Sequence, residues 1–408
     1  MERNMADADH RDRINFLRLL LIIGLVFLHY GTFPGSEHSP YSGANSFDPA
    51  TPIASFVNSY FVFLFYSAVP VLGAISGYLF FKDWMPGGQF YLTRIRSRTY
   101  SILLPMISWC AIILSLFVLI RLASPNSSFL SLIEYDLNKF GITQFINSLV
   151  GLTRRPINFQ FWFLHDLFLT VLFAPVLGLL IRRAPFLGLA IIGVIYFAGI
   201  NLVIFFRNDV LFFFYLGGLI RVRDWDLDFI APRTAAIAMA AYVVIVGLRT
   251  LAPIYVPEHS MLGDFIFGPG TRILRLLGVA AFWGCAPFLM RTAAGRLITT
   301  WGTLAFFLHA IHWPLNQFIK AGLAQVFPAD GELSRMVNYM ATIALTLAAA
   351  FVIAWMLNAV APKLFSHLSG GRAFGRAKIR TASAAPVAVP TADTAIPPES
   401  AGRVPYRS

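Results

Sequence analysis

The stretch INFLRLLLIIGLVFLHYGTF, residues 14–33, is long and apolar enough to cross a membrane, yet it contains Arg18 and His29. An α-helix rises about 1.5 Å per residue, with about 3.6 residues per turn. Side chains eleven positions apart therefore return to almost the same face, roughly 16 Å apart along the axis. Ionisable residues within a membrane span are costly and commonly mark functional sites. The spacing predicts one helix face with an anion site at one end and proton chemistry at the other.

The composition places the whole chain in a membrane. Hydrophobic residues make up 57% of the 408 residues and charged residues 13%, whereas soluble domains carry about 25% charged residues. The predicted fold is all-α, a polytopic integral membrane bundle of about ten transmembrane helices, or of nine with one re-entrant piece. The expected spans are 15–33, 56–81, 99–121, 160–181, 186–206, 209–221, 233–251, 272–290, 298–320 and 336–360.

Lys and Arg residues in the connections indicate the orientation. They are more numerous in the connections on the side of the N-terminus, which predicts cytoplasmic N- and C-termini in a multi-pass protein of the cell inner (plasma) membrane. The opposite side still carries several arginines, which are expected either to contact an anionic substrate or to anchor the helices at the interface. These outer arginines are Arg154, Arg155, Arg207, Arg272 and Arg275.

Three regions follow from this pattern. Residues 1–14 are expected to form a cytoplasmic basic arm, 15–360 the transmembrane domain, and 366–408 a disordered cytoplasmic tail rich in Ala, Pro, Arg and Thr. The net charge of +12 is attributed to cytoplasmic bias and contact with membrane lipid, so no nucleic-acid partner is expected. Cys110 and Cys285 fall in different predicted spans and do not indicate a disulfide framework or a metal site.

Several further motifs accompany the Arg18–His29 pair in a fixed order. They are GAISGYLF at 73–80, RIRSRTYSILLP at 94–105, FWFLHDLFLTVLFAPVL at 161–177, FFFYLGGLI at 212–220 and FFLHAIHWPL at 306–315. Together they resemble the membrane acyltransferase-3 family of integral membrane O-acyltransferases, over residues 13 to about 360. The resemblance implies transfer of an acyl group, expected to be acetyl, from acyl-CoA to a sugar, glycan or other hydroxylated acceptor of the cell envelope. It implies acyl-CoA as a donor substrate and no permanently bound cofactor.

The residues of the first span suit this chemistry. Attack of a hydroxyl on a thioester needs a base, and histidine has a suitable pKa near neutral pH. His29 is therefore the expected catalytic base, acting by direct acceptor attack or through an acyl-histidine intermediate. Arg18 lies toward the cytoplasm, where its planar charge suits donor phosphates. Arg94 and Arg98 are also expected to bind the donor, or else only to set the topology.

The sequence leaves the partner of His29 open among Asp166, His165 and His312. His165 and Asp166 lie at a similar depth and are expected to orient or recharge the base, although an interfacial pair facing water fits equally. His309 and His312 lie one turn apart, with helix–helix hydrogen bonding expected for His309. The expected acceptor-binding residues are His312, Trp162 and Arg155. No third ligand accompanies the two histidines, so no metal is expected.

A transporter or flippase of a glycan or lipid-linked intermediate is the alternative function. It would also place charged residues inside the bundle. Such proteins commonly carry Gly- or Pro-interrupted helices at corresponding positions in two halves. The sequence has no such pair, so the acyltransferase is the favoured prediction.

Overall fold

The computed structural model describes residues 2–227 and 230–375, and all regular elements in these ranges are helical. The first half contains α1 (Glu2–Leu28), α2 (Pro52–Leu64), α3 (Ala68–Phe80), α4 (Gly88–Arg98), α5 (Leu104–Ala123), α6 (Ile142–Val150), α7 (Trp162–Leu172), α8 (Ala174–Arg183) and α9 (Pro185–Ala198). The second contains α10 (Asp209–Val222), α11 (Pro232–Leu251), α12 (Met261–Phe265), α13 (Thr271–Leu289), α14 (Ala293–Thr300), α15 (Ala305–Val326), α16 (Glu332–Val360) and α17 (Pro362–Leu368). The all-α prediction is therefore confirmed.

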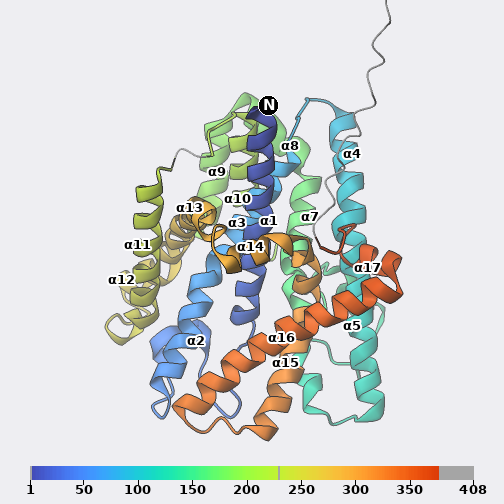
Figure 1. Cartoon of the computed structure of the whole chain (residues 1–408), viewed down its shortest axis with the longest axis vertical. Coiled ribbons are helices and arrows are strands. Elements are labelled where there is room, and N and C mark those ends of the chain that lie inside the picture. Colours follow the sequence, from blue (N-terminus) through green and yellow to red (C-terminus); the bar gives the residue numbers. More distant parts are fainter. Residues whose placement is uncertain (1, 228–229, 376–408) are drawn as a thin grey trace, which may run out of the picture. The chain divides into compact units, whose positions relative to one another are not determined.

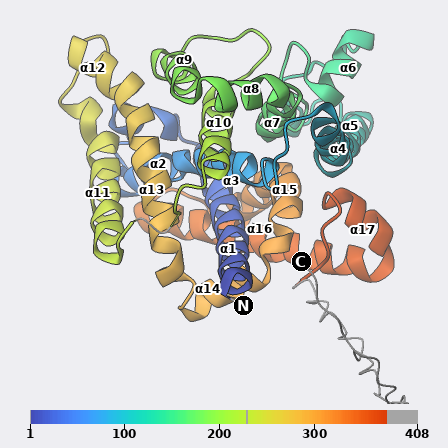
Figure 2. The same cartoon turned by 90° about the horizontal axis from the view of Figure 1, so that it is seen from above.

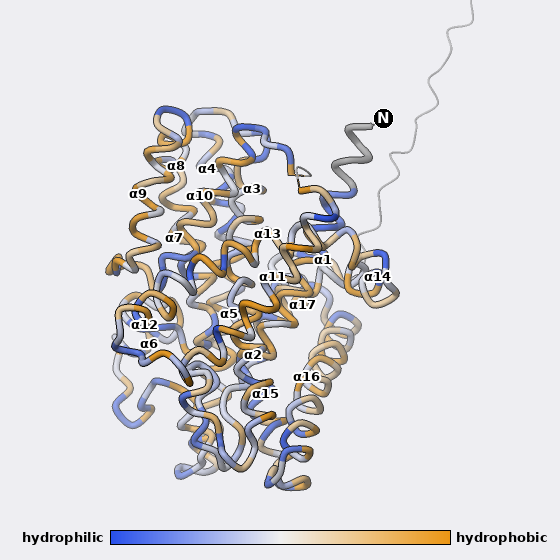
Figure 3. Tube along the Cα trace, turned by 90° about the vertical axis from the view of Figure 1, so that its left-hand side faces the viewer, coloured by the Kyte–Doolittle hydropathy of each residue, from blue (hydrophilic) through white to orange (hydrophobic). Residues whose placement is uncertain are grey.

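The bundle has the apolar exterior expected of a membrane protein. Large apolar side chains lie exposed along α11 and α16, including Val244, Leu248, Val352 and Trp355. Figure 3 shows hydrophobic positions along the helices and hydrophilic ones gathered toward their ends and connections. Such side chains are stable when lipid covers them, because lipid tails do not penalise apolar surface.

The number of membrane-crossing helices is smaller than predicted. Five helical stretches of the described residues are long and apolar enough to span, or six if one bent pair counts as a span. The structure therefore does not show the ten expected spans. One reason is length, since α9 and α10 each have 14 residues and reach only about 21 Å, against a hydrocarbon core of about 30 Å. The bent pair is α7 and α8, which meet at 59° just before Pro175, a residue that breaks helices.

Helix α1 lies inside the bundle and contacts α2, α3, α13, α14, α15 and α16 (Figures 1 and 2). The residues predicted to form an N-terminal arm belong to this helix, because α1 runs from residue 2 to residue 28. Helices α3 and α10 form the closest pair. A Cβ atom on Gly77 would lie 2.0 Å from the Phe214 carbonyl oxygen, and one on Gly217 would lie 1.9 Å from the Ala74 carbonyl oxygen. Only glycine permits such close backbone contact.

The ordered chain extends further than the sequence indicated. Residues 366–375 were assigned to the disordered tail, but α17 continues to Leu368, and Phe374 packs against Trp301, Phe351 and Phe365. The tail prediction is thus wrong for this segment, because aromatic packing against α16 and α17 outweighs its polar composition. Residues 376–408 lie outside the described part of the chain, so their predicted disorder stays a prediction.

The loop between α1 and α2 is fixed to the start of α16. The Asp48 carboxylate accepts hydrogen bonds from Arg335 and Ser36, and the Arg335 hydrogen bond lowers the pKa of Asp48. Glu332 accepts from the Ile53 and Ala54 amides at the start of α2, which compensates helix-end donors that would otherwise lack partners. These contacts hold the loop over the end of α1, close to His29.

Candidate active site

The centre of the site is a chain of hydrogen bonds that ends at His29. His29 Nδ1 lies 2.9 Å from His312 Nε2, and His312 Nδ1 lies 3.0 Å from the Leu308 carbonyl oxygen. A carbonyl only accepts, so His312 Nδ1 carries the proton and its Nε2 accepts from His29 Nδ1–H. The remaining His29 nitrogen, Nε2, is then unprotonated. The contacts thus fix His29 in the tautomer of a general base.

Both rings are neutral in this arrangement. His29 is 9% exposed and His312 is fully buried. No carboxylate contacts either ring among the described residues. A buried charge needs a counter-charge, and two neutral imidazoles joined by one hydrogen bond need none.

Helix α15 determines where His29 lies. Its sequence HWPLN interrupts the helix at Trp313, whose backbone is extended just before Pro314, as expected of a residue that precedes proline. His312 lies before this break. Asn316 and Gln317 follow it and donate to the His29 carbonyl oxygen at 2.9 and 3.0 Å. Lys320 donates to the next carbonyl along the chain, that of Tyr30. The side chains of α15 thereby replace the hydrogen bonds that α1 loses at its end.

His29 lines a cavity of about 230 Å³ at this end of α1. Trp162 and Arg155, both predicted acceptor residues, line the same cavity, together with Arg207 and Asp209. The Arg207 guanidinium lies 5.0 Å from the centre of the Trp162 ring, a cation–π distance. His312 is not among the lining residues. It contacts His29 instead, so the structure does not place it at the acceptor position predicted for it. We call this space the outer cavity.

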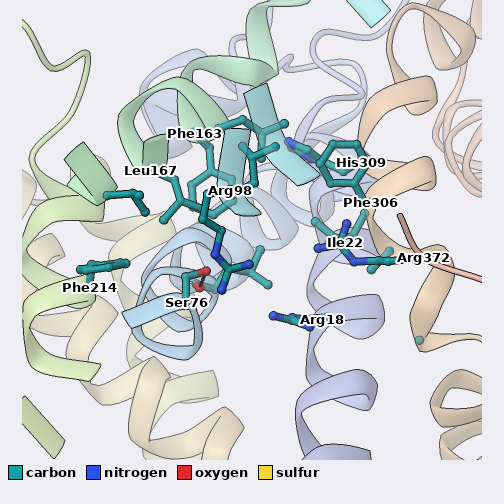
Figure 4. Close-up of a pocket in the computed structure, with 16 residues that line it drawn as sticks. Arg18, Ile22, Ser76, Arg98, Phe163, Leu167, Phe214, Phe306, His309 and Arg372 are labelled. Atoms are coloured by element: carbon teal, nitrogen blue, oxygen red, sulfur yellow. Dashed lines mark hydrogen bonds between the residues drawn. The ribbon is translucent and has the colours of Figure 1, made fainter. Parts of the chain in front are cut away.

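A second cavity surrounds Arg18 (Figure 4). It has a volume of about 80 Å³, and the guanidinium groups of Arg18, Arg98 and Arg372 converge on it. No acidic side chain lines it among the described residues. The Arg372 guanidinium donates to the Ser369 carbonyl at 2.9 Å and lies 5.1 Å from the Phe306 ring centre. We call this space the inner cavity.

The two cavities meet at shared residues. Phe163 and His309 line both of them. Arg18 and Ile22 of α1 line the inner cavity, and Leu25 of α1 and His29, the residue just after its end, line the outer one. One face of α1 therefore borders both cavities, as the spacing of Arg18 and His29 predicted. The nitrogens of the buried His309 ring have no hydrogen-bond partner in the structure, which leaves polar atoms at the junction.

Two residues expected to be catalytic, His165 and Asp166, do not contact His29 in the structure. The His165 ring bonds to Asp166 at 3.0 Å and packs on Phe206. The Asp166 carboxylate accepts from the Phe206 and Arg207 amides. This pair does not line either cavity, so it is His312 and not Asp166 or His165 that partners His29. The pair fixes the loop that presents Arg207, which is a structural role that adjacency in sequence could not reveal.

Of the three residues predicted to bind the donor, two line a cavity and one does not. Arg18 and Arg98 line the inner cavity. Arg94 does not, because its guanidinium donates to the Lys82 carbonyl and lies over the Phe90 ring. Sequence reasoning missed Arg372, which it placed in a disordered tail. The aromatic Phe374 beside it was the available signal that this segment packs on the bundle.

Comparison with known proteins identifies the family of this chain. A family model described as an acyltransferase domain, Acyl_transf_3, matches residues 11–357. The chain belongs to the acyltransferase-3 family. The resemblance read from the motifs is thus confirmed, and the protein is an O-acyltransferase. Like other members, this acyltransferase is a helical membrane protein.

One curated relative and the solved structures add to this assignment. The acyltransferase is 28% identical over 315 residues to the succinoglycan biosynthesis protein ExoH of Rhizobium meliloti (strain 1021). The match covers 76% of this chain and 79% of the relative. No solved structure matches the chain.

Proposed function

We propose that this acyltransferase moves an acyl group, expected to be acetyl, from cytoplasmic acyl-CoA to a hydroxyl of a polysaccharide or its glycan precursor. The observation that carries the proposal is that His29, hydrogen-bonded to His312, borders a cavity that meets an arginine-lined one. The relative named for succinoglycan biosynthesis supports a glycan acceptor. The basic N-terminal side supports a multi-pass inner-membrane location with both described ends of the bundle in the cytoplasm.

The inner cavity suits the phosphates of the donor. Three guanidinium groups without an acidic neighbour among the described lining residues leave positive charge unbalanced. Arginine binds phosphate through two parallel hydrogen bonds. A CoA molecule with its phosphates at Arg18, Arg98 and Arg372 directs its thioester arm along the α1 face toward His29.

The transfer step follows from the tautomer of His29. The acceptor oxygen attacks the thioester carbonyl carbon, and His29 Nε2 takes the hydroxyl proton. The new C–O bond forms as the C–S bond breaks, and the departing thiolate takes the proton from His29. The products are free CoA thiol and an O-acyl ester. His312 Nε2 accepts a hydrogen bond from the transient imidazolium, a charge-assisted bond stronger than the neutral one. The same free Nε2 would also serve an acyl-histidine intermediate.

The proposed function is tested on the product. We expect mass spectrometry of envelope glycans to show the loss of one acyl mass when the gene is deleted, and its return when the intact gene is restored. An unchanged glycan acylation pattern in the deletion strain, under conditions where the protein is made, would contradict the proposal.

The donor site is tested by Arg372→Gln and Arg18→Gln. Each change removes one charge-assisted contact to phosphate, so we expect the KM for acyl-CoA to rise about ten-fold per variant, the equivalent of about 1.4 kcal/mol. Initial rates of the purified protein in nanodiscs measure this effect. Arg94→Gln is the matched control, because Arg94 lies outside the inner cavity. If Arg94→Gln raises the KM as much as Arg372→Gln does, the donor does not bind in the inner cavity.

A further inference from the structure

A third cavity adjoins the outer one. It has a volume of about 360 Å³ and lies where the end of α9 meets the starts of α10 and α13. Arg207 and Asp209 line both this cavity and the outer cavity. The two spaces are therefore neighbours, and a ligand larger than one sugar residue can occupy both. We call the third space the arginine cavity.

The charges in the arginine cavity do not balance. Arg207 and Arg275 both pair with the same oxygen of Asp209, at 3.0 and 2.9 Å. Arg272 also lines the cavity and donates to the Phe197 carbonyl at 2.8 Å. Asp209 is the one acidic side chain among the described lining residues. Three guanidinium groups facing one carboxylate leave two positive charges without an anion.

A buried donor in the same cavity also lacks a partner. Arg275 is 8% exposed, and its Nε–H makes no hydrogen bond in the structure. Leaving a buried hydrogen-bond donor unpaired costs about 1–3 kcal/mol. Arg275 lines the arginine cavity, and a ligand oxygen that accepted a hydrogen bond from it would offset this cost. Arginine is the side chain whose geometry best fits carboxylate and phosphate oxygens.

The remaining lining residues suit a carbohydrate. The amide side chains of Asn201 and Asn208 and the aromatic rings of Phe206 and Phe267 border the arginine cavity. Amides pair with hydroxyl groups, and aromatic rings offer flat apolar surface for the faces of sugar rings. The cavity therefore combines an anion site with groups that bind a neutral sugar.

We propose that the acceptor is an anionic glycan, and that Arg272, Arg207 and Arg275 bind a carboxylate or phosphate group which it carries. The hydroxyl to be acylated then lies in the outer cavity at His29, on a nearby part of the same glycan. This inference rests on the proposed function and adds the chemical class of the acceptor. The arginine cavity selects the acceptor, whereas the inner cavity selects the donor.

Binding of three matched oligosaccharides tests the inference. They are a tetrasaccharide ending in glucuronate, the same compound with its carboxyl group reduced to the alcohol, and the alcohol form carrying a phosphate monoester. We expect the intact protein in nanodiscs to bind at least one anionic form about ten-fold more tightly than the neutral form. The preferred anion identifies the group. The preference is expected to persist in 0.15 M salt, because a partly buried site is screened less than a surface site.

The decisive variant is Arg272→Gln, which removes a charge without disturbing the Asp209 ion pairs. We expect it to lower affinity for the anionic form to within about two-fold of the neutral form. Arg154→Gln is the matched control, because Arg154 is exposed and lines none of the three cavities. Elution as a single species and an unchanged thermal midpoint confirm that each variant folds.

The outcomes separate this inference from the proposed function. Equal binding of all three oligosaccharides, or an Arg272→Gln variant with an intact anion preference, would overturn the inference. The proposed function would then stand on the acyl-transfer measurement alone. Conversely, a glucuronate preference that depends on Arg272, found in a protein without transferase activity, would support the anion site and contradict the assigned reaction.

Discussion

Replacing His29 with alanine is expected to reduce acyl transfer about a thousand-fold or more, within the range attributed to general acid–base catalysis. Hydrogen bonds in the structure determine the tautomer of His29 and leave its Nε2 unprotonated. His29 lines the outer cavity. Alanine removes that nitrogen but leaves the arginines of the inner cavity in place. We therefore expect kcat to fall while the KM for acyl-CoA changes less than three-fold, about 0.65 kcal/mol.

The measurement is transfer of a labelled acyl group from acyl-CoA in nanodiscs, together with donor binding by equilibrium dialysis. His367→Ala is the matched histidine control, since His367 lies on α17, bonds to Ser108 of α5 and lines neither cavity of the active site. It should retain wild-type activity. His29→Gln should be as inactive as His29→Ala, because an amide cannot take up the acceptor proton. A His29→Ala enzyme with more than a tenth of the wild-type kcat would rule out His29 as the base.

The common face of Arg18 and His29 could be predicted from sequence because it depends on one local segment, although α1 is not among the described helical stretches that are long and apolar enough to span. Arg18 lies on α1 and His29 directly follows its last residue, with its amide still bonded to the Leu25 carbonyl, so their common face follows from helix geometry. The structure places that face along both cavities. The fold class follows from composition for a similar reason. The number of spans did not follow, because apolar stretches of similar hydropathy form short helices such as α9 and α10, or bend at Pro175.

The partner of His29 was not determined by sequence because it depends on packing between distant segments. His312 is 283 positions away, and it meets His29 only because Asn316 and Gln317 bind the end of α1. Asp166 has a carboxylate that could orient a histidine and lies at a similar predicted depth. In the structure its oxygens accept hydrogen bonds from the backbone amides of residues 206 and 207. A linear sequence does not show which buried groups already have partners.

Replacing His312 with leucine is expected to lower kcat about a hundred-fold, the second-largest effect of a single substitution. Leucine fills similar space but accepts no hydrogen bond, so His29 loses the partner that fixes its tautomer and stabilises its charged form. His312 does not line the cavities, so the KM values for donor and acceptor should stay within about three-fold. Steady-state kinetics with both substrates measures this split.

His312→Gln distinguishes positioning from simple packing. The glutamine side chain carries an amide oxygen that accepts a hydrogen bond from His29 Nδ1–H, so it should recover about ten-fold of the activity lost in His312→Leu. A residue that only fills space would give the opposite order, because leucine packs better than a buried amide does. Equal kcat for the two variants, with both proteins folded, would show that the hydrogen bond between the two histidines has no part in catalysis. Recovery with glutamine alone assigns the contribution of His312 to the hydrogen bond that it accepts from His29.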